Sequence, residues 1–213
     1  MKKRIYFVRH GESEGNVGPI FQTDETPLTP TGKSQAEIVA NRCANLPIET
    51  IICSPILRAK ETAECIVKKV QKPIQYSNLF VERGRPSQIY GKPKNDPIAL
   101  QADKEISEKF HLPNFRFSDE ENFEDLKARA GKALQFLSEQ PEGHILVVTH
   151  GFFARILASY AIFGEMMTGD DCRKIVRAIH MQNTALSVFT YNNERPPEFY
   201  WGIWIWNDHA HLG

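Results

Sequence analysis

Two histidines in the sequence, His10 and His150, are each followed by glycine and preceded by a short apolar run. The runs are Ile5–Val8 and Ile145–Val148, separated from the histidines by Arg9 and by a threonine. Continuous apolar runs of this length predict buried strands, and in an open α/β sheet ligands bind at the carboxyl ends of the strands. The sequence therefore predicts that both histidines stand at a ligand-binding edge.

The residues around His10 indicate which ligand this edge binds. Gly11 and Gly15 permit a tight turn after the strand, and we expect amides of that turn to hold an anion beside the Arg9 guanidinium. A single Arg-His-Gly would be read only as a polar strand end. A second His-Gly pair, His150-Gly151, follows the other apolar run, and this repetition favours a phosphate site.

Composition and charge exclude several other classes of protein. The 213 residues fit one α/β domain, 1–213, and the 26 basic residues balance the 26 acidic ones, so no nucleic-acid or membrane partner is predicted. The basic start, Met1–Arg4, precedes an apolar run too short for a secretory signal, and no stretch approaches the ~20 apolar residues of a membrane span. We predict a cytoplasmic protein.

The sequence offers no convincing metal or disulfide pattern. The four cysteines have no C-x-x-C spacing, and we expect them to be reduced core residues: Cys43, Cys53, Cys65 and Cys172. His209 and His211 would bind a metal weakly, but a frayed tail is the better interpretation. We predict no metal and no cofactor.

Apolar periodicity predicts alternating strands and helices. Strands are expected at residues 5–8, 50–53, 74–76, 145–149, 185–190 and 199–206, and helices at 30–43, 56–70, 123–137 and 152–160. Thr29, Ser54 and Ser118 are the expected caps or capping-box residues of the first three helices. This order predicts a three-layer α/β/α sandwich with a mainly parallel sheet and an antiparallel edge strand.

Two segments stand apart from this pattern. Residues 83–118 are polar, with one amphipathic stretch at 98–110, and we predict a cap or insertion over the sheet edge that sets specificity. The aromatic segment 200–206 is assigned to core packing, with a homodimer surface as the sharper alternative.

Three motifs of the chain resemble those of the histidine phosphatase superfamily, the phosphoglycerate mutase-like family. They are Arg9–Asn16, Ser54–Ala63 and Thr149–Gly151, each at a predicted strand end and in the family's order. The resemblance covers nearly the whole chain and implies the phosphoglycerate mutase-like fold, phosphatase branch.

The resemblance also implies roles for individual residues. His10 would be the nucleophile that becomes a phosphohistidine, which agrees with the nucleophilicity of neutral imidazole. Arg9, Arg58 and His150 would hold the phosphoryl oxygens, whose charge is spread in the transition state. Substrate-binding donors are expected at Asn16, Gln22 and the Gly151 amide, together with the helix start after His150.

The general acid is assigned to Glu82, which follows the third predicted strand as in the family. The continuation 83–87 departs from the family pattern, so a surface ion pair of Glu82 with Arg83 or Arg85 is the competing interpretation. Glu12, Glu14 and Glu61 are lower-ranked candidates for the acid.

We therefore predict a phosphomonoesterase for a small phosphorylated metabolite. A phosphoglycerate mutase is the nearest alternative, although the mutases' Tyr-Gly continuation after the acid is missing. The alternative from another class is a regulatory module that binds phosphate without turnover.

Overall fold

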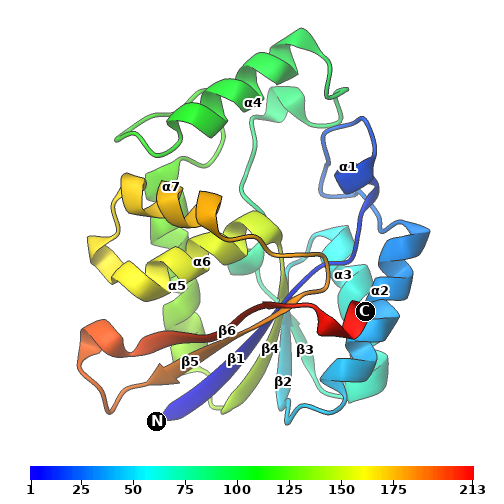
Figure 1. The fold of residues 1–213 in the computed structure, drawn as a ribbon, viewed down its shortest axis with the longest axis vertical. Helices are drawn as coiled ribbons and strands as arrows, with labels where there is room; N and C mark the ends of the chain where they lie inside the picture. The colour runs from blue at the N-terminus through cyan, green and yellow to red at the C-terminus, as the bar shows by residue number, and fades with distance from the viewer.

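The computed structural model describes residues 1–213 and contains one six-stranded sheet flanked by helices (Figure 1). The strands are β1 (Lys2–Arg9), β2 (Thr50–Cys53), β3 (Ile74–Tyr76), β4 (His144–Thr149), β5 (Leu186–Asn192) and β6 (Trp201–Asp208). Their order across the sheet is β3-β2-β4-β1-β5-β6. β1 to β4 are parallel, and β5 is antiparallel to both of its neighbours, β1 and β6. The predicted mainly parallel sheet with an antiparallel edge is confirmed.

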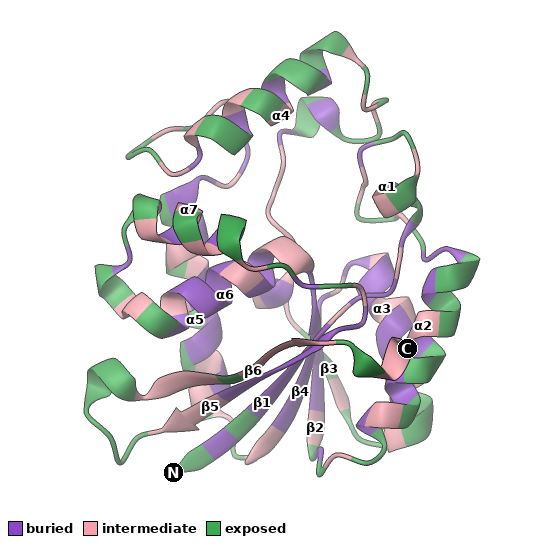
Figure 2. Ribbon diagram, in the orientation of Figure 1, coloured by how far each residue is buried: buried purple, intermediate pink, exposed green.

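The structure has seven helices. They are α1 (Glu14–Val17), α2 (Pro30–Cys43), α3 (Leu57–Val70), α4 (Pro97–Lys109), α5 (Phe123–Glu139), α6 (Gly151–Phe163) and α7 (Gly169–Ala178). Of these, α2 and α3 cover one face of the sheet and α5 and α6, with α7 packed on α6, cover the other. Ile5 and Phe7 of β1 contribute to the core beneath α5 and α6, whereas Tyr6 and Val8 contribute to the core beneath α2 and α3. This alternation follows from the two-residue period of a strand, so every central strand is apolar on both faces (Figure 2).

The helix starts agree only in part with the predicted caps. Thr29 caps α2 as expected, with Pro30 at the first position and a hydrogen bond from the Gly32 amide. The predicted caps of the next two long helices are wrong. α3 begins after Ile56, and the capping box of α5 is formed by Asn122 and Asp125.

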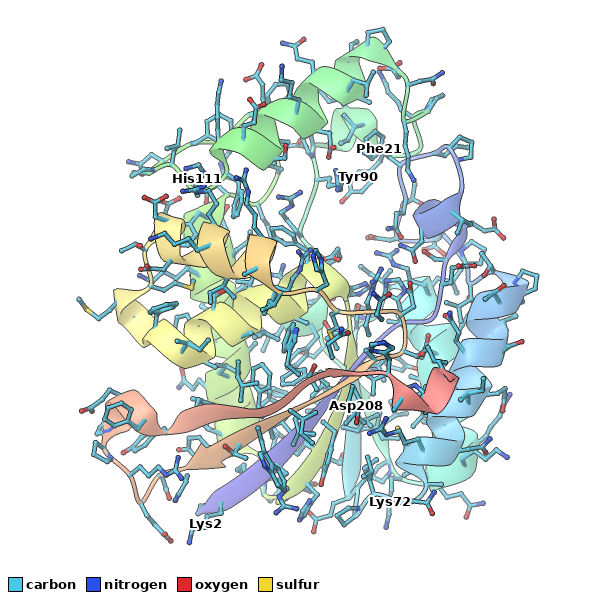
Figure 3. The ribbon with its side chains drawn as sticks, viewed as in Figure 1. Lys2, Phe21, Lys72, Tyr90, His111 and Asp208 are labelled. Carbon is cyan, nitrogen blue, oxygen red and sulfur yellow. The ribbon has the colours of Figure 1, made fainter.

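Residues 83–118 form a lobe that reaches away from the sheet, with α4 at its outer side (Figure 1). α4 carries the predicted amphipathic stretch. Its Ala99 and Ala102 join Phe21 and Ile89 in a small apolar cluster, whereas Ile106 joins the main core beneath α5 and α6. Phe21 and Tyr90 lie beneath α4, on the side that faces the sheet edge (Figure 3). None of the helices is both long and apolar enough to cross a membrane.

Candidate active site

The two histidines meet because their strands are neighbours. Arg9 of β1 is in register with Thr149 of β4, so the residues that follow, His10 and His150, leave the sheet side by side. Both imidazoles are buried, and their ring centroids are 5.2 Å apart. The predicted meeting of the two His-Gly motifs at one edge of the sheet is confirmed.

The surroundings of His10 leave one ring nitrogen, Nε2, without a proton. Its Nδ1 lies 2.7 Å from the Gly11 carbonyl oxygen, an acceptor only, so Nδ1 carries the proton and Nε2 keeps a lone pair. Burial, followed by the nearby His150, Arg58 and Arg9, holds the pKa of His10 well below its ordinary value. His10 is therefore neutral at physiological pH, and its Nε2 accepts a hydrogen bond from the Arg58 Nε at 3.3 Å.

His150 is held by Ser54, which stands at the end of β2. The Ser54 hydroxyl lies 2.8 Å from the His150 Nε2 and accepts a hydrogen bond from the Ile56 amide, so its proton is free for Nε2. When the Ser54 hydroxyl donates to Nε2, the imidazole proton stands on Nδ1, a buried nitrogen without a protein partner. Burial and then Arg58 hold the pKa of His150 well below its ordinary value, so it is a neutral donor in the free protein.

Two arginines, the half-buried Arg9 and the buried Arg58, supply the positive charge. Arg9 donates to the Met181 carbonyl oxygen at 2.6 Å, while its Nε is buried without a partner. Arg58, in the first turn of α3, donates from Nη1 to the Thr23 carbonyl oxygen at 3.1 Å. Burial lowers the pKa of both guanidinium groups and the carboxylate of Glu82 opposes this, and both stay charged because arginine does not lose its proton in proteins.

The turn after β1 does not offer its amides to a ligand, so that part of the prediction is wrong. The amides of Gly11, Glu12 and Ser13 donate to the side chains of Thr62, Gln35 and Asn16 respectively. The close approach that glycine permits serves packing instead, since a Cβ on Gly11 would lie 2.4 Å from the carbonyl oxygen of Gly32.

Asn16 and Gln22 keep donors available at the same edge. The Asn16 Oδ1 accepts hydrogen bonds from the Ser13 amide and the Asn183 Nδ2, and the Gln22 Oε1 accepts one from the Ser13 hydroxyl. The Nδ2 of Asn16 and the Nε2 of Gln22 are the donor ends of these amides and make no hydrogen bond within the protein. Both side chains are therefore oriented by their oxygens.

Glu82 lies at the amino terminus of α6. Its Oε1 accepts hydrogen bonds from the amides of Arg83 at 2.9 Å and Phe153 at 3.0 Å, and its Oε2 accepts one from Phe152 at 3.2 Å. The carboxylate, rather than a ligand, therefore uses the positive end of the α6 dipole. The competing interpretation of Glu82 as a surface ion pair with Arg83 or Arg85 is wrong, since Glu82 pairs with neither and Arg85 pairs with Asp103.

The electrostatics of Glu82 reflect two opposing effects. Burial alone raises the pKa of this carboxyl, but the three backbone amides and Arg58 outweigh burial, so the pKa is lowered from its ordinary value. Glu82 is consequently ionised at neutral pH in the free protein. With Arg9 and Arg58 charged and both histidines neutral, these five groups carry a net charge of about +1, which suits an anionic ligand.

The lower-ranked carboxylates have structural partners. Glu12 accepts a hydrogen bond from the Thr29 hydroxyl at 2.7 Å, and Glu61 accepts one from the Leu28 amide at 2.7 Å. Glu14 is exposed in the short helix α1.

Two openings border the site, and Glu82 lines both. One has a volume of about 240 Å³ and is lined by Gln22, Arg58, Glu82 and the start of the lobe, including Arg83 and Tyr90. The other, of about 330 Å³, is lined by Arg9, Glu82, Gly151 and Arg155. The structure thus groups every predicted site residue at or beside one edge of the sheet.

Several residues at this edge were missed by sequence reasoning. Asn183 donates from Nδ2 to the His10 carbonyl oxygen at 3.0 Å, and the Thr184 amide donates to the Arg9 carbonyl oxygen at 3.0 Å. A signal existed, because an antiparallel strand begins at the edge where its parallel neighbours end, and Asn183 lies two residues before the predicted strand 185–190. Ser54 and Thr62 lie within the second motif, but nothing in their spacing indicates their partners.

The cysteines and acidic groups offer no second centre. All four cysteines are free, and burial raises the pKa of Cys43 and Cys172 to about 12. No group of three or more histidine, cysteine, aspartate or glutamate side chains is arranged to hold a metal ion.

Comparison with known proteins identifies the family. The model of the histidine phosphatase superfamily (branch 1) matches residues 5–203. The chain is 28% identical over 210 residues to "Uncharacterized phosphatase PhoE" of Bacillus subtilis, covering 98% of this chain and 96% of the relative. It is 29% identical to "Probable phosphoglycerate mutase GpmB" of Photorhabdus laumondii, covering 98% and 94%.

Solved structures agree on the fold. YhfR of Bacillus stearothermophilus superposes with a TM-score of 0.82 at 23% identity, over 99% of this chain and all of that one. The sheet edge with its two histidines and the family match together lead to one conclusion. The chain belongs to the histidine phosphatase superfamily, branch 1, and is an enzyme that hydrolyses phosphate esters.

Proposed function

We propose that this enzyme is a phosphomonoesterase for a small phosphorylated metabolite and that it works through a phosphohistidine on His10. The observation that carries the proposal is the orientation of the His10 imidazole. The Gly11 carbonyl fixes the proton on Nδ1, the low pKa keeps the ring neutral, and Nε2 faces the Arg58 guanidinium. A phosphoryl group placed between Nε2, Arg9 and Arg58 meets a nucleophile and two cations at once.

In the first step, the lone pair of the His10 Nε2 forms a bond to phosphorus while the bond from phosphorus to the ester oxygen breaks. Glu82 gives its proton to the departing alkoxide oxygen. In the free enzyme Glu82 is ionised, and the anionic phosphoryl group bound beside it raises its pKa so that it carries this proton.

In the second step, the Glu82 carboxylate takes a proton from a water molecule as the water oxygen bonds to phosphorus. The bond from phosphorus to Nε2 breaks, and its electron pair returns to His10. Arg9, Arg58, the His150 Nδ1, the Gly151 amide and the free amide ends of Asn16 and Gln22 are the proposed donors to the phosphoryl oxygens.

Trapping the phosphoenzyme tests this proposal. Wild type incubated with a ³²P-labelled phosphomonoester and quenched in alkali should retain label that acid releases, because a phosphoramidate is acid-labile and alkali-stable. His10→Ala should lose this label and its turnover while keeping the thermal transition of the wild type. Turnover by His10→Ala near the wild-type rate would exclude the covalent mechanism.

One observation favours phosphoryl transfer of the mutase type as a second candidate. The Arg83 guanidinium lines the opening beside Glu82 and stacks 4.2 Å from the centroid of the Phe152 ring, yet it makes no hydrogen bond or ion pair. Burial lowers its pKa to about 10, so it remains a cation available to a second anionic group.

Release of inorganic phosphate in the presence of excess phosphoglycerate separates the two candidates, since a mutase returns the phosphoryl group to another hydroxyl. A module that binds phosphate without turnover would release none.

We also propose that residues 83–118 act as a specificity cap within a single domain. Arg83, Gly84, Arg85 and Tyr90 line the opening that leads to Arg58 and Glu82, which supports this role. Cytoplasmic location and a homodimer remain predictions of the sequence.

A further inference from the structure

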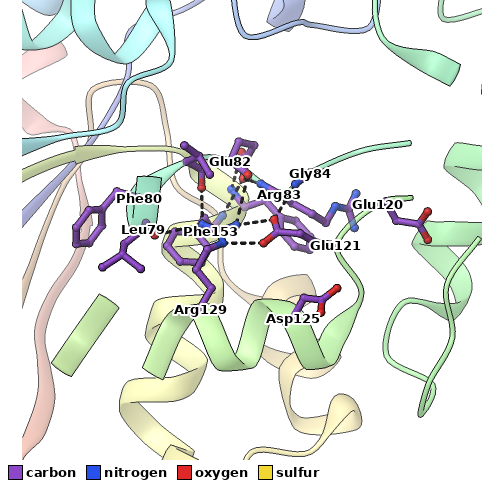
Figure 4. Close-up of polar contacts among 12 residues, drawn as sticks. Leu79, Phe80, Glu82, Arg83, Gly84, Glu120, Glu121, Asp125, Arg129 and Phe153 are labelled. Atoms are coloured by element: carbon purple, nitrogen blue, oxygen red, sulfur yellow. Dashed lines mark hydrogen bonds and ion pairs between the residues drawn. The ribbon is translucent and has the colours of Figure 1, made fainter. Parts of the chain in front are cut away.

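Arg129 of α5 lies behind Glu82, outside both openings of the site that Glu82 lines. Its side chain is 13% exposed, and all five of its N–H groups have acceptors. Nε and Nη2 donate to the two carboxylate oxygens of Glu121, each at 2.7 Å. The remaining donors reach the backbone around Glu82 (Figure 4).

Those backbone contacts bracket the proposed acid. Nη1 of Arg129 donates to the carbonyl oxygens of Leu79 at 3.2 Å and Val81 at 2.9 Å, and Nη2 donates to that of Glu82 itself at 3.4 Å. Three of the four carbonyl groups from Leu79 to Glu82 are thus fixed by one planar group. This segment has no strand partner, because β3 ends at Tyr76.

Arg129 also touches the helix end that holds the Glu82 carboxylate. Its guanidinium carbon lies 3.7 Å from the centroid of the Phe153 ring, and the Phe153 amide donates to the Glu82 Oε1. One side chain therefore contacts the backbone that carries Glu82 and the residue that orients its carboxylate.

Glu121 extends this arrangement to the lobe. Its Oε2 accepts a hydrogen bond from the Gly84 amide at 2.8 Å, and its own amide donates to the Gly84 carbonyl oxygen at 3.1 Å. Gly84 and Glu121 stand at the two ends of the lobe, so the ion pair joins both ends to the segment that carries the acid.

From these contacts we propose that the Arg129–Glu121 ion pair is the positioning element of Glu82 and couples the lobe to the acid. The inference rests on the proposed role of Glu82. A lysine at this position has three donors and no planar fork, so it satisfies the charge of Glu121 but not the carbonyl groups as well.

A double-mutant cycle with two substrates tests the proposal. The variants are Arg129→Met, Glu82→Gln and the double variant, each assayed on nitrophenyl phosphate and on glycerol phosphate. A nitrophenolate departs without a proton, whereas a glycerol alkoxide requires one. Arg129→Met should lower kcat on glycerol phosphate by about 10–10²-fold, because misplacing a catalytic group by up to an ångström has an effect of this size. The loss of kcat on nitrophenyl phosphate should be much smaller.

In the Glu82→Gln background, Arg129→Met should cause no further substrate-selective loss, since the group it positions is gone. Arg129→Lys should restore only part of the rate on glycerol phosphate. Arg42→Met is the matched control, because it removes a half-buried ion pair with Asp208 that is remote from residues 79–84. It should lower the Tm without changing the ratio of rates on the two substrates.

Equal losses on both substrates, or a selective loss that persists beside Glu82→Gln, would overturn the proposal. If Arg129→Met does not fold, Glu121→Gln replaces it, since it removes the charge while keeping an acceptor for the Gly84 amide. Glu121 also lines the opening beside Glu82, so only the part of its substrate-selective loss that disappears in the Glu82→Gln background supports the proposal. Failure of the acid assignment itself is seen separately, because Glu82→Gln alone would then show no selectivity between the substrates.

Discussion

At the scale of single residues, the proposed mechanism requires Glu82 to be protonated for the first step and ionised for the second. Glu82→Gln keeps the size of the side chain but has no proton to give to an alkoxide. We expect its turnover on an alkyl phosphate to fall by roughly 10²–10⁴-fold, the usual contribution of a positioned acid, with a much smaller loss on nitrophenyl phosphate. The ratio of the two rates is the measurement, and small equal losses would show that Glu82 is not the acid.

Gly151 offers a test of the Arg9 guanidinium without removing it. A Cβ at this position would lie 3.0 Å from the Arg9 Nε and 3.1 Å from its Cδ, so Gly151→Ala must displace the guanidinium by a few tenths of an ångström. We expect kcat/KM to fall by about 3–10-fold and inhibition by orthovanadate to weaken in parallel. Gly143→Ala is the control, since its Cβ would meet nothing closer than 3.7 Å. Unchanged vanadate inhibition in Gly151→Ala would argue against Arg9 as a ligand of the phosphoryl group.

The position of four site residues at one edge of the sheet could be predicted from the sequence. Arg9, His10 and His150 stand at or just beyond the end of an apolar run, and Arg58 stands in the first turn of the helix that follows another apolar run. The sequence could not indicate that the amides near His10 are already occupied, because their acceptors, such as Thr62 and Gln35, come from other elements. The same reason hides Arg129, whose acceptors lie around Glu82 and at Glu121. Side-chain partners distant in sequence leave no periodic signal.

At the scale of elements, the first half of α4 packs in a small core of its own, whereas Ile106 and Phe110 join the core beneath α5 and α6. We expect the part of the lobe around the small core to open separately from the sheet. Ile89 is fully buried in the cluster with Phe21. Ile89→Ala should therefore lower stability by about 2–5 kcal/mol, and most of this loss should fall on local opening of the lobe. KM should rise more than kcat falls, and hydrogen exchange should accelerate over α4 with little change in Tm. Ile66→Ala, equally buried but under the sheet, should lower Tm and leave KM unchanged. Identical behaviour of the two variants would show that the lobe is not an independent unit.

Elements were predicted well where burial dictates the pattern and poorly where local capping decides a boundary. The strands β1 and β4 follow directly from their apolar runs. The capping box of α5 was assigned to the wrong residues, because Ser118–Glu121 has the spacing of a capping box, as do Asn122 and Asp125. Glu121 is instead engaged by Arg129, so tertiary contacts decide between two local alternatives.

At the scale of the whole molecule, two buried neutral histidines make stability depend on pH. The folded-state pKa values of His10 and His150 are depressed, so below about pH 6.5 the unfolded chain binds protons that the folded chain does not. Stability should therefore fall with acidification by up to about 1.4 kcal/mol per pH unit for each histidine. Urea unfolding between pH 7 and 5, in a buffer without phosphate, measures this slope.

The difference between variants isolates the contribution of the site, since other histidines also titrate. His10→Gln and His150→Gln should each show a shallower decline of unfolding free energy than the wild type over this range. A decline as steep as that of the wild type in both variants would mean that neither histidine is neutral in the folded protein.

The position of β4 between β1 and β2 has a consequence for how the chain is made. β1 and β2 leave the ribosome early, but neither borders the other, and their shared neighbour is synthesised only after the lobe and α5. The nascent chain must therefore hold two apolar strand edges apart until residues 144–149 arrive to join them. His10 and His150 are brought together by this late insertion, so the proposed site is complete only when the centre of the sheet has closed.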